Sequence, residues 1–295
     1  MGIDRRDERR RRAAPALRLA LCALLLLPAA RAARAAGADL RFGVLSYPGR
    51  FGSEDQNLLG VLPVQFVLTG AGSRFTITVP YVSLRHTGNV ILTADGPVIL
   101  GAGGPGRPTF QTSGAGDEQK GLGDIVLTEE HLLMRAGKGK RPQIALVLDF
   151  KIPTADKTKG LGTGRRDWSA GLSYAQPLGK VVQILGDYSY RFMGDPEGLD
   201  LRDRPRLGAG LAFVINRYTL RTLVESMRPA IGDVPVFDAA GAPIGIETVR
   251  DRRVARADLT VRSLLGGSTR IGLTKGLNGD SGDLGLVLIF STGNQ

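Results

Sequence analysis

The chain has 295 residues, of which 42% are hydrophobic, 6% aromatic and 23% charged, with 41 glycines, one cysteine and a formal net charge of +11. The apolar content is too high for an intrinsically disordered chain, and a single cysteine excludes a scaffold held by internal disulfides. Glycine is about twice as frequent as its usual value of about 7%. This abundance favours turns and closely paired strands over helices, in which each glycine costs about 1 kcal/mol relative to alanine.

Residues 1–38 are expected to be a secretory signal peptide. An arginine-rich opening precedes an apolar run from Leu19 to Leu27, which is followed by Pro28 and by an alanine-rich stretch with cleavage sites ending at Ala35 or Ala38. The apolar run is shorter than the roughly 20 residues that a membrane-spanning helix needs. The order of charged, apolar and small residues therefore predicts export and cleavage.

Removal of this segment changes the charge and the thiol content of the chain. Nine arginines and Cys22 lie within it, so residues 39–295 form a mature domain without cysteine and with most of the basic excess removed. A thiol nucleophile and a cysteine metal site are thereby excluded for that domain. Its arginines are dispersed rather than clustered with stacking aromatic residues, which argues against nucleic-acid binding.

Beyond the signal peptide, apolar residues recur with period two, which places them on one face of a strand. The pattern is clearest at 144–152, where one face is wholly apolar and the other carries Asp149 and Lys151. Twelve strands of about 10 residues would span a membrane and, once closed, would leave no free edge. In chain order the predicted strands cover residues 41–47, 58–68, 74–86, 121–134, 142–152, 167–176, 181–192, 206–215, 217–226, 253–264, 269–276 and 283–291.

Two of these strands depart from the expected length or from the regular alternation. The first, 41–47, is short, and without it the strand count falls to eleven. In the third strand, Pro80 cannot donate a ladder hydrogen bond and predicts a bulge, after which the side chains switch to the opposite faces of the strand. After this bulge we expect Val82 and Leu84, rather than Tyr81 and Ser83, on the apolar outer side.

The joins between the predicted strands are alternately long and short. Long joins such as 87–120 and 227–252 are each followed by a short one such as 135–141 or 265–268. Transmembrane barrels show this alternation because their periplasmic turns are short, their outer loops are long and their strand number is even. A soluble sandwich also alternates apolar and polar faces but has no reason to alternate its joins. The fold class is therefore predicted as all-β, a closed antiparallel transmembrane β-barrel of twelve strands, with loops 87–120 and 227–252 at the cell surface.

The last strand carries a second signal of the same class. Asp283, Gly285, Leu288 and Phe290 follow the spacing of the assembly signal of outer-membrane barrels, although Leu288 replaces an aromatic residue and residues 291–295 extend beyond it. The expected location is the outer membrane of a Gram-negative bacterium. The expected partners are outer-membrane lipid and lipopolysaccharide, together with the barrel-assembly machinery, which would bind the last strand.

Two segments, 121–127 and 152–180, carry three short motifs: Gly121, Gly123 and Asp124; Pro153 and Thr154; Gly162, Gly164 and Asp167. With these motifs the chain resembles a known family of bacterial outer-membrane barrels, labelled putative transporters of the MetA pathway of phenol degradation. The resemblance covers about 60 residues closely and departs from the family pattern at Ala155 and at 129–131. It implies uptake of aromatic compounds.

Residues capable of catalysis are few. The chain has two histidines, His86 and His131. Ser83 is three residues from His86 and would face the opposite way in a regular strand. Glu129 does share a face with His131 and could orient its imidazole, but no nucleophile accompanies the pair. We therefore expect no enzyme activity, with a barrel hydrolase as the least favoured function.

Cofactor and metal sites are also not expected. The glycines of 101–106 lack the flanking strand, helix and lysine of a phosphate-binding loop. Asn278, Asp280 and Asp283 could hold calcium, but a short hairpin favours the same residue types for its turn.

The charged residues of the polar strand face are the candidate site. They could form an internal network of ion pairs, because buried charges must be paired, or they could line an aqueous path and set its selectivity. These residues are Asp149, Lys151, Asp167, Asp187, Arg191, Arg206, Arg217, Arg221, Glu225, Arg256, Asp258, Arg262 and Arg270.

Twelve strands leave a narrow lumen, which loop 87–120 could plug. The sequence therefore favours a passive channel or transporter for small molecules, aromatic or hydrophobic ones among them. The alternative is a structural or adhesive barrel that acts through its long outer loops. A soluble periplasmic β-domain is the remaining alternative outside the membrane.

Overall fold

In the computed structural model, the described residues are 37–49, 57–85, 90–93, 96–99, 118–137, 141–196, 199, 201–231, 234–237, 243–247, 251–264, 266–278 and 284–293. The predicted signal peptide lies almost wholly outside them. Among the described residues, no helix is long and apolar enough to cross a membrane. The strands are β1 (Gly37–Gly49), β2 (Asn57–Thr69), β3 (Ser73–Arg85), β4 (Val90–Thr93), β5 (Gly96–Ile99), β6 (Glu118–Leu122), β7 (Ile125–Met134), β8 (Gln143–Ile152), β9 (Asp167–Pro177), β10 (Val182–Phe192), β11 (Arg204–Ile215), β12 (Tyr218–Met227), β13 (Val234–Phe237), β14 (Pro243–Glu247), β15 (Arg252–Arg262), β16 (Ser268–Gly276) and β17 (Leu284–Ser291).

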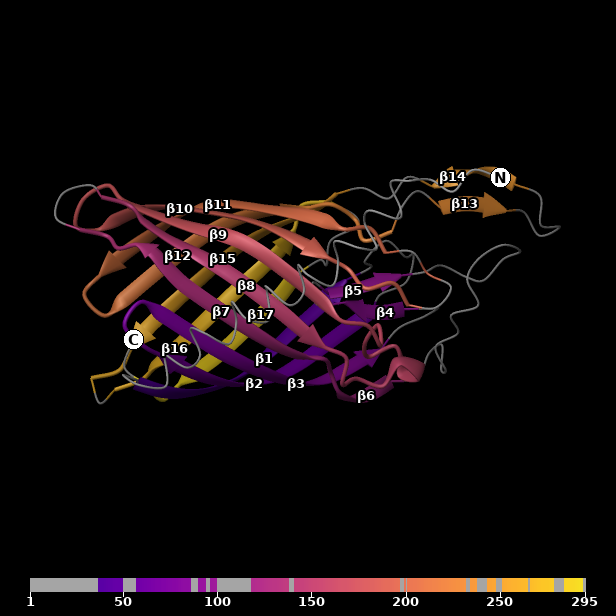
Figure 1. Cartoon of the computed structure of the whole chain (residues 1–295), viewed down its shortest axis with the longest axis horizontal. Coiled ribbons are helices and arrows are strands. Elements are labelled where there is room, and N and C mark those ends of the chain that lie inside the picture. The colour runs from indigo at the N-terminus through magenta and orange to yellow at the C-terminus, as the bar shows by residue number, and fades with distance from the viewer. Residues whose placement is uncertain are drawn as a thin grey trace, which may run out of the picture.

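The large sheet closes on itself into an antiparallel barrel of twelve strands (Figure 1). β1 pairs with β2 on one side and with β17 on the other, so the first and last strands form the seam. β6 and β7 follow one another along the same edge of β3 and together occupy one strand position. Two hairpins, β4–β5 and β13–β14, form separate two-stranded sheets. The predicted all-β barrel of twelve strands is confirmed.

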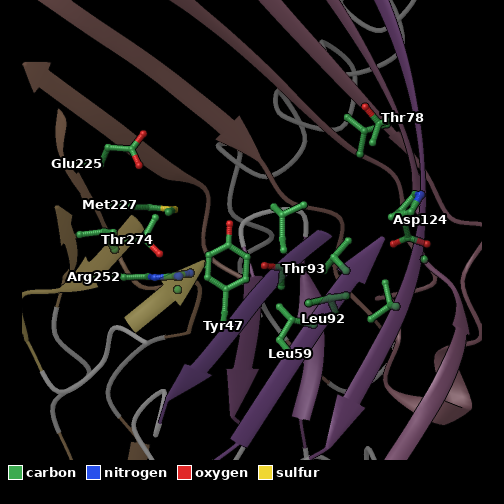
Figure 2. A pocket seen from close by; sticks show the side chains of 18 of the residues that line it. Tyr47, Leu59, Thr78, Leu92, Thr93, Asp124, Glu225, Met227, Arg252 and Thr274 are labelled. Atoms are coloured by element: carbon green, nitrogen blue, oxygen red, sulfur yellow. The ribbon is translucent and has the colours of Figure 1, made fainter. Parts of the chain in front are cut away.

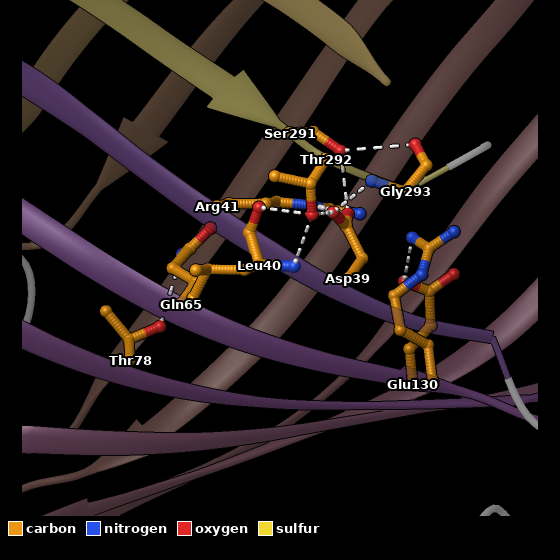
Figure 3. A network of polar contacts seen from close by, with 10 residues as sticks. Asp39, Leu40, Arg41, Gln65, Thr78, Glu130, Ser291, Thr292 and Gly293 are labelled. Atoms are coloured by element: carbon orange, nitrogen blue, oxygen red, sulfur yellow. Dashed lines mark hydrogen bonds and ion pairs between the residues drawn. The ribbon is translucent and has the colours of Figure 1, made fainter. Parts of the chain in front are cut away.

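The seam between the termini is held by side chains as well as by the backbone ladder (Figure 3). Asp39 in β1 accepts hydrogen bonds from Ser291 Oγ at 2.7 Å and from Gly293 N at 2.6 Å. The same carboxylate pairs with Arg41 at 2.7 Å. These bonds place both ends of the barrel chain at one end of the molecule, as an even strand number requires.

The outer surface of the barrel is apolar, as the alternation of residues predicts. Phe42, Phe66 and Leu207 are 47%, 52% and 60% exposed, although each is a large hydrophobic side chain. Such exposure is unfavourable in water and favourable in lipid. Aromatic rings gather where β9 begins and β10 ends, with Trp168 stacked on Phe192 at 3.8 Å between ring centroids.

Glycines on the inner face make room for charged side chains. A Cβ atom at Gly208 would collide with the carboxylate of Asp187, and one at Gly272 would collide with the carboxylate of Asp258. Each glycine lies directly opposite its acidic partner on the neighbouring strand. The high glycine content is therefore explained in part by a crowded, polar lumen.

The prediction that side chains switch faces of the strand after Pro80 is wrong. Pro80 pairs with Pro63, and the register between β2 and β3 continues without a shift from Leu58 to Thr69. Val82 and Leu84 consequently face inward, where both are 1% exposed. Their apolar character reflects an apolar lumen at this level, which the sequence pattern alone does not distinguish from lipid.

The two ends of the barrel differ as the alternation of joins predicts (Figure 1). The short turns lie at the end where the C-terminus is labelled, and the tightest is the Asn216–Arg217 corner, where Asn216 has φ of 52°. The hairpins β4–β5 and β13–β14 and a short 3₁₀-helix, η1 (Lys157–Lys159), lie at the opposite end. Neither hairpin was predicted, because each strand has only four or five residues.

Candidate functional site in the barrel lumen

A buried ion cluster lies at the inner wall near the long-loop end. The Lys151 ammonium group is 3.0 Å from Asp124 Oδ2 and 3.0 Å from Asp167 Oδ2. It also donates a hydrogen bond of 2.6 Å to Thr163 Oγ1. The side chains of Lys151 and Asp167 are 2% and 0% exposed. Charges removed from water to this degree are tolerated only with such partners.

The three motifs that carry the family resemblance meet at this cluster. Thr154 Oγ1 donates to Gly123 O at 2.9 Å and accepts from Ile125 N at 3.0 Å, so it spans the break between β6 and β7. Ala155 N donates to Asp124 Oδ1 at 3.0 Å. A Cβ atom at Gly162 would lie 2.8 Å from that same carboxylate oxygen. The motif residues therefore fasten loop 153–166 to the inner wall.

Loop 153–166 is ordered by its own short helix. Asp156 caps η1 by accepting from Thr158 N at 2.9 Å, and Gly160 ends the helix with φ of 71°. Hydrogen bonds from the Thr158 hydroxyl and backbone amide lower the pKa of the exposed Asp156 carboxyl. Beyond the helix, Leu161 is 1% exposed and packs against Leu59, Val82 and Leu84. The loop thus places an apolar side chain inside the barrel.

The β4–β5 hairpin bridges the lumen above this loop. Leu92 N donates to Gly160 O at 2.9 Å, which joins the hairpin to loop 153–166. Arg204 in β11 donates to Thr93 Oγ1 at 3.2 Å. Because β3 and β11 are five strand positions apart, the hairpin reaches from one side of the barrel to nearly the opposite wall. This part of the predicted plug loop 87–120 therefore narrows the lumen, and most of the rest lies outside the described residues.

A cavity of about 360 Å³ lies inside the barrel at this level. One wall is apolar and comes from β1, β2 and β3, with Leu92 and Leu161 added by the two loops. The facing wall is charged and comes from β11, β12, β15 and β16 (Figure 2). Tyr47 stands between these walls in the view of Figure 2, with Leu59 and Leu92 on one side and Arg252 on the other.

The charged wall carries more positive than negative side chains, and some of these side chains form ion pairs. Arg206 pairs with Glu225 in β12 and lies 4.0 Å from Asp187 Oδ2. Deeper in the barrel, Arg270 pairs with Asp258 at 2.6 Å. Arg256 lines the cavity, and its buried Nε has no hydrogen-bond partner among the described residues.

The strand register places twelve of the thirteen predicted charged residues on the inner face. Four of them line the cavity itself: Lys151, Arg206, Glu225 and Arg256. Arg217 differs, since it lies in the two-residue turn with its guanidinium group against the ring and hydroxyl of Tyr218. The inner-face set is completed by Asp149, Asp167, Asp187, Arg191, Arg221, Asp258, Arg262 and Arg270. A role in a substrate path stays a prediction for all of them.

Sequence reasoning missed several residues of the site. Arg204 and Arg252 begin their strands, but the strands predicted from the sequence begin at residues 206 and 253, which assigns both arginines to loops. Extending the period of two backward from Arg206 and from Arg256 would have found them. No local pattern could have identified Thr93, because its partner Arg204 is 111 residues away.

The predicted Glu129 and His131 lie on the outer face, away from the cavity. His131 pairs across the ladder with Ser73, whose Oγ is 2.8 Å from His131 Nδ1. Glu129 is 1% exposed, and neither of its carboxylate oxygens has a hydrogen-bond partner among the described residues. The imidazole therefore has a hydroxyl neighbour but no orienting carboxylate in contact with it, and His86 lies outside the described residues.

Metal binding finds no support in the described part of the chain. No group of three or more histidine, cysteine, aspartate or glutamate residues is placed there to hold an ion. Asn278 instead accepts from Arg253 N at 3.2 Å, which joins the segment after β16 to the start of β15. Asp280 and Asp283 lie outside the described residues, as do the glycines of 101–106.

The fold matches solved structures of outer-membrane barrels. One is the COG4313 outer membrane channel from Pseudomonas putida F1, with a TM-score of 0.61 and 11% identity over 88% of this chain and 95% of that one. A second is the NanC porin, with a TM-score of 0.46 and 8% identity over 88% of this chain and 100% of that one. A third is the CymD monoaromatic hydrocarbon channel, with a TM-score of 0.44 and 10% identity over 88% of this chain and 88% of that one. Neither the protein-family models nor the curated proteins give a match. At these identities the comparison establishes the outer-membrane β-barrel fold.

Proposed function

We propose that the chain forms a channel or transporter for small molecules in the outer membrane of a Gram-negative bacterium, after export by its signal peptide. The observation that carries the proposal is a cavity of about 360 Å³ inside a closed barrel, narrowed by loop 153–166 and the β4–β5 hairpin. A barrel that served only as a scaffold would not need an interior space bounded by positioned loops.

Two further features support this function. The solved structure with a TM-score of 0.61 is titled an outer membrane channel. The resemblance of residues 121–127 and 152–180 to the MetA-pathway barrels supports aromatic or hydrophobic solutes, because the motif residues position Leu161 in the cavity wall. Outer-membrane lipid and lipopolysaccharide would surround the apolar face, and the barrel-assembly machinery would bind β17.

The structural or adhesive alternative also has an observation in its favour. The β13–β14 hairpin stands beyond the barrel end in Figure 1 and is not part of the barrel sheet. A surface-exposed hairpin could bind an external partner without any transport. Transport and adhesion make different demands, because only transport needs the lumen.

The proposed function can be tested by solute flux. Proteoliposomes containing the purified barrel should take up radiolabelled toluene or benzyl alcohol faster than protein-free liposomes. As a prior check, the protein should fractionate with outer membranes and migrate faster on gels before boiling than after. Flux equal to that of protein-free liposomes, with a correctly folded barrel, would leave the adhesive function as the better one.

A further inference from the structure

The cavity offers two different surfaces to one bound molecule. Its apolar wall includes Leu59, Leu92 and Leu161, and its charged wall includes Arg206, Arg252 and Arg256. Neither a purely apolar solute nor a small inorganic ion would use both walls. A molecule with an apolar body and a polar end would contact each wall with a matching surface.

The sign of the polar end follows from how the cavity charges are paired. Both carboxylates of the lining are already engaged, Asp124 with Lys151 at 3.0 Å and Glu225 with Arg206. The buried Nε of Arg256 has no hydrogen-bond partner among the described residues, and neither Arg206–Glu225 nor Arg270–Asp258 includes Arg256. A cation with a buried and unpartnered donor is stabilised by an anion that reaches it. The cavity therefore favours a negatively charged end.

Tyr47 marks the boundary between the two walls. It packs against the apolar cluster of Leu59, Val82, Leu84 and Leu161. Arg252 and Arg256 line the same cavity, and Figure 2 shows Arg252 on the other side of the Tyr47 ring. A ligand lying along this ring would have its apolar body beside the leucines and its charged end beside the guanidinium groups.

The chemistry of arginine selects the kind of anion. A guanidinium group presents a planar fork of donors that matches a carboxylate through two parallel hydrogen bonds. The cavity volume of about 360 Å³ lies at the lower end of the usual range of about 300 to 1,000 Å³ for small-molecule sites. It is therefore suited to a molecule of one ring or a short chain.

We propose that this cavity binds small amphipathic carboxylates of monoaromatic size, with Arg256 holding the carboxylate and Leu92 and Leu161 holding the apolar body. This inference rests on the proposed channel function and names its substrate class. Arg256 and Leu92 are then the residues that determine specificity, one for the charge and the other for the apolar body.

The test compares three probes by isothermal titration calorimetry on the purified barrel in detergent. Benzoate carries both features, benzyl alcohol lacks the charge, and acetate lacks the apolar body. Benzoate should bind at least tenfold more tightly than either of the other two. Equal affinity for benzoate and benzyl alcohol would overturn the proposal.

Two variants test which wall of the cavity contacts the carboxylate and which contacts the apolar body. Arg256→Gln should weaken benzoate at least tenfold and leave benzyl alcohol unchanged, whereas Leu92→Asn should weaken both. Arg253→Gln removes an outward-facing arginine from the same strand and should change neither, and each variant is first checked for heat-modifiable gel migration. Unchanged benzoate binding in a folded Arg256→Gln barrel would also overturn the proposal.

Conductance in potassium chloride separates this inference from the channel function. A barrel that conducts but shows no preference for benzoate would refute the substrate class alone. A barrel that binds benzoate as expected but neither conducts nor passes solute would refute the channel function and retain the binding site.

Discussion

Lys151 shows how a single residue connects the barrel wall to its loop. It lies on β8, but its partners Asp124, Thr163 and Asp167 come from the β6–β7 break, loop 153–166 and β9. Removal of a buried charge is costly because it leaves the opposite charges without compensation. The cluster therefore fixes both the position of the loop and the fold of the wall beneath it.

Lys151→Met should lower the free energy of unfolding by about 3 to 5 kcal/mol, because two buried carboxylates would lose their cation. Lys120→Met provides the control, since Lys120 pairs with Glu118 at 2.8 Å but is 52% exposed. Such an exposed pair contributes little to stability, because water screens its charges. Urea titration of the barrel in lipid vesicles measures both losses. Similar losses for the two variants would show that the Lys151 cluster is not buried in the folded protein.

Two adjacent residues of β8 test which face of the strand points to lipid and which points to the lumen. Leu146 faces outward beside Leu172, and Val147 faces inward between Glu130 and Gly171. Leu146→Arg should destabilise the barrel by about 2 to 4 kcal/mol because the charge would enter lipid. Val147→Arg should be tolerated, since the lumen already holds charge and Glu130 lies opposite. Equal tolerance in the same vesicle titration would contradict the assigned facing.

At the scale of elements, the sequence predicts the barrel strands better than the loops. A strand such as β8 alternates between lipid and lumen for ten residues, and each alternate position reports the same environment. β4 and β5 have four residues each, and their position depends on Arg204 and on Gly160. Such contacts between distant segments leave no periodic signal in the sequence.

The β6–β7 break illustrates the same limit within a strand. Residues 121–134 were predicted as one strand, but the ladder is interrupted at Gly123 and Asp124. Gly123 N instead donates to Pro80 O at 2.8 Å, and Thr154 satisfies the neighbouring backbone groups. The Gly-x-Gly-Asp motif marks this break, but only its partners in loop 153–166 show why the break is stable.

Leu161 should control how firmly loop 153–166 is held. Leu161→Ala removes a buried side chain worth about 2 to 5 kcal/mol, which would raise the open population of the loop more than tenfold. Trypsin should then cleave at Lys157 and Lys159 correspondingly faster in the detergent-solubilised barrel. Leu178→Ala, at an exposed leucine in a short turn of the opposite end, should leave the cleavage rate unchanged. An unchanged rate in Leu161→Ala would show that the leucine does not hold the loop.

At the scale of the whole molecule, the alternation of long and short joins was the most informative sequence feature. It depends on a property that every strand shares, namely that successive strands cross the same layer in opposite directions. The lumen is less predictable, because apolar residues such as Val82 can face either lipid or an apolar cavity. The candidate site was therefore predicted as a set of inner-face charges, without the apolar wall that faces them.

The orientation of the barrel in the membrane predicts which joins reach the cell surface. Epitope tags inserted at Gly104 and Ala240, in the long joins, should be labelled by antibody on intact cells. Tags at Gly139 and Gly267, in the short joins, should be labelled only after the outer membrane is permeabilised. The reverse pattern would show that the topology is inverted.

Single-channel recording in planar lipid bilayers tests the channel function most directly. The purified barrel should give discrete conductance steps in potassium chloride. A variant without residues 88–116, which include β4 and β5, should give larger steps because the hairpin that bridges the lumen is gone. Absence of steps in both proteins, with heat-modifiable migration retained, would contradict a channel and favour a structural or adhesive barrel.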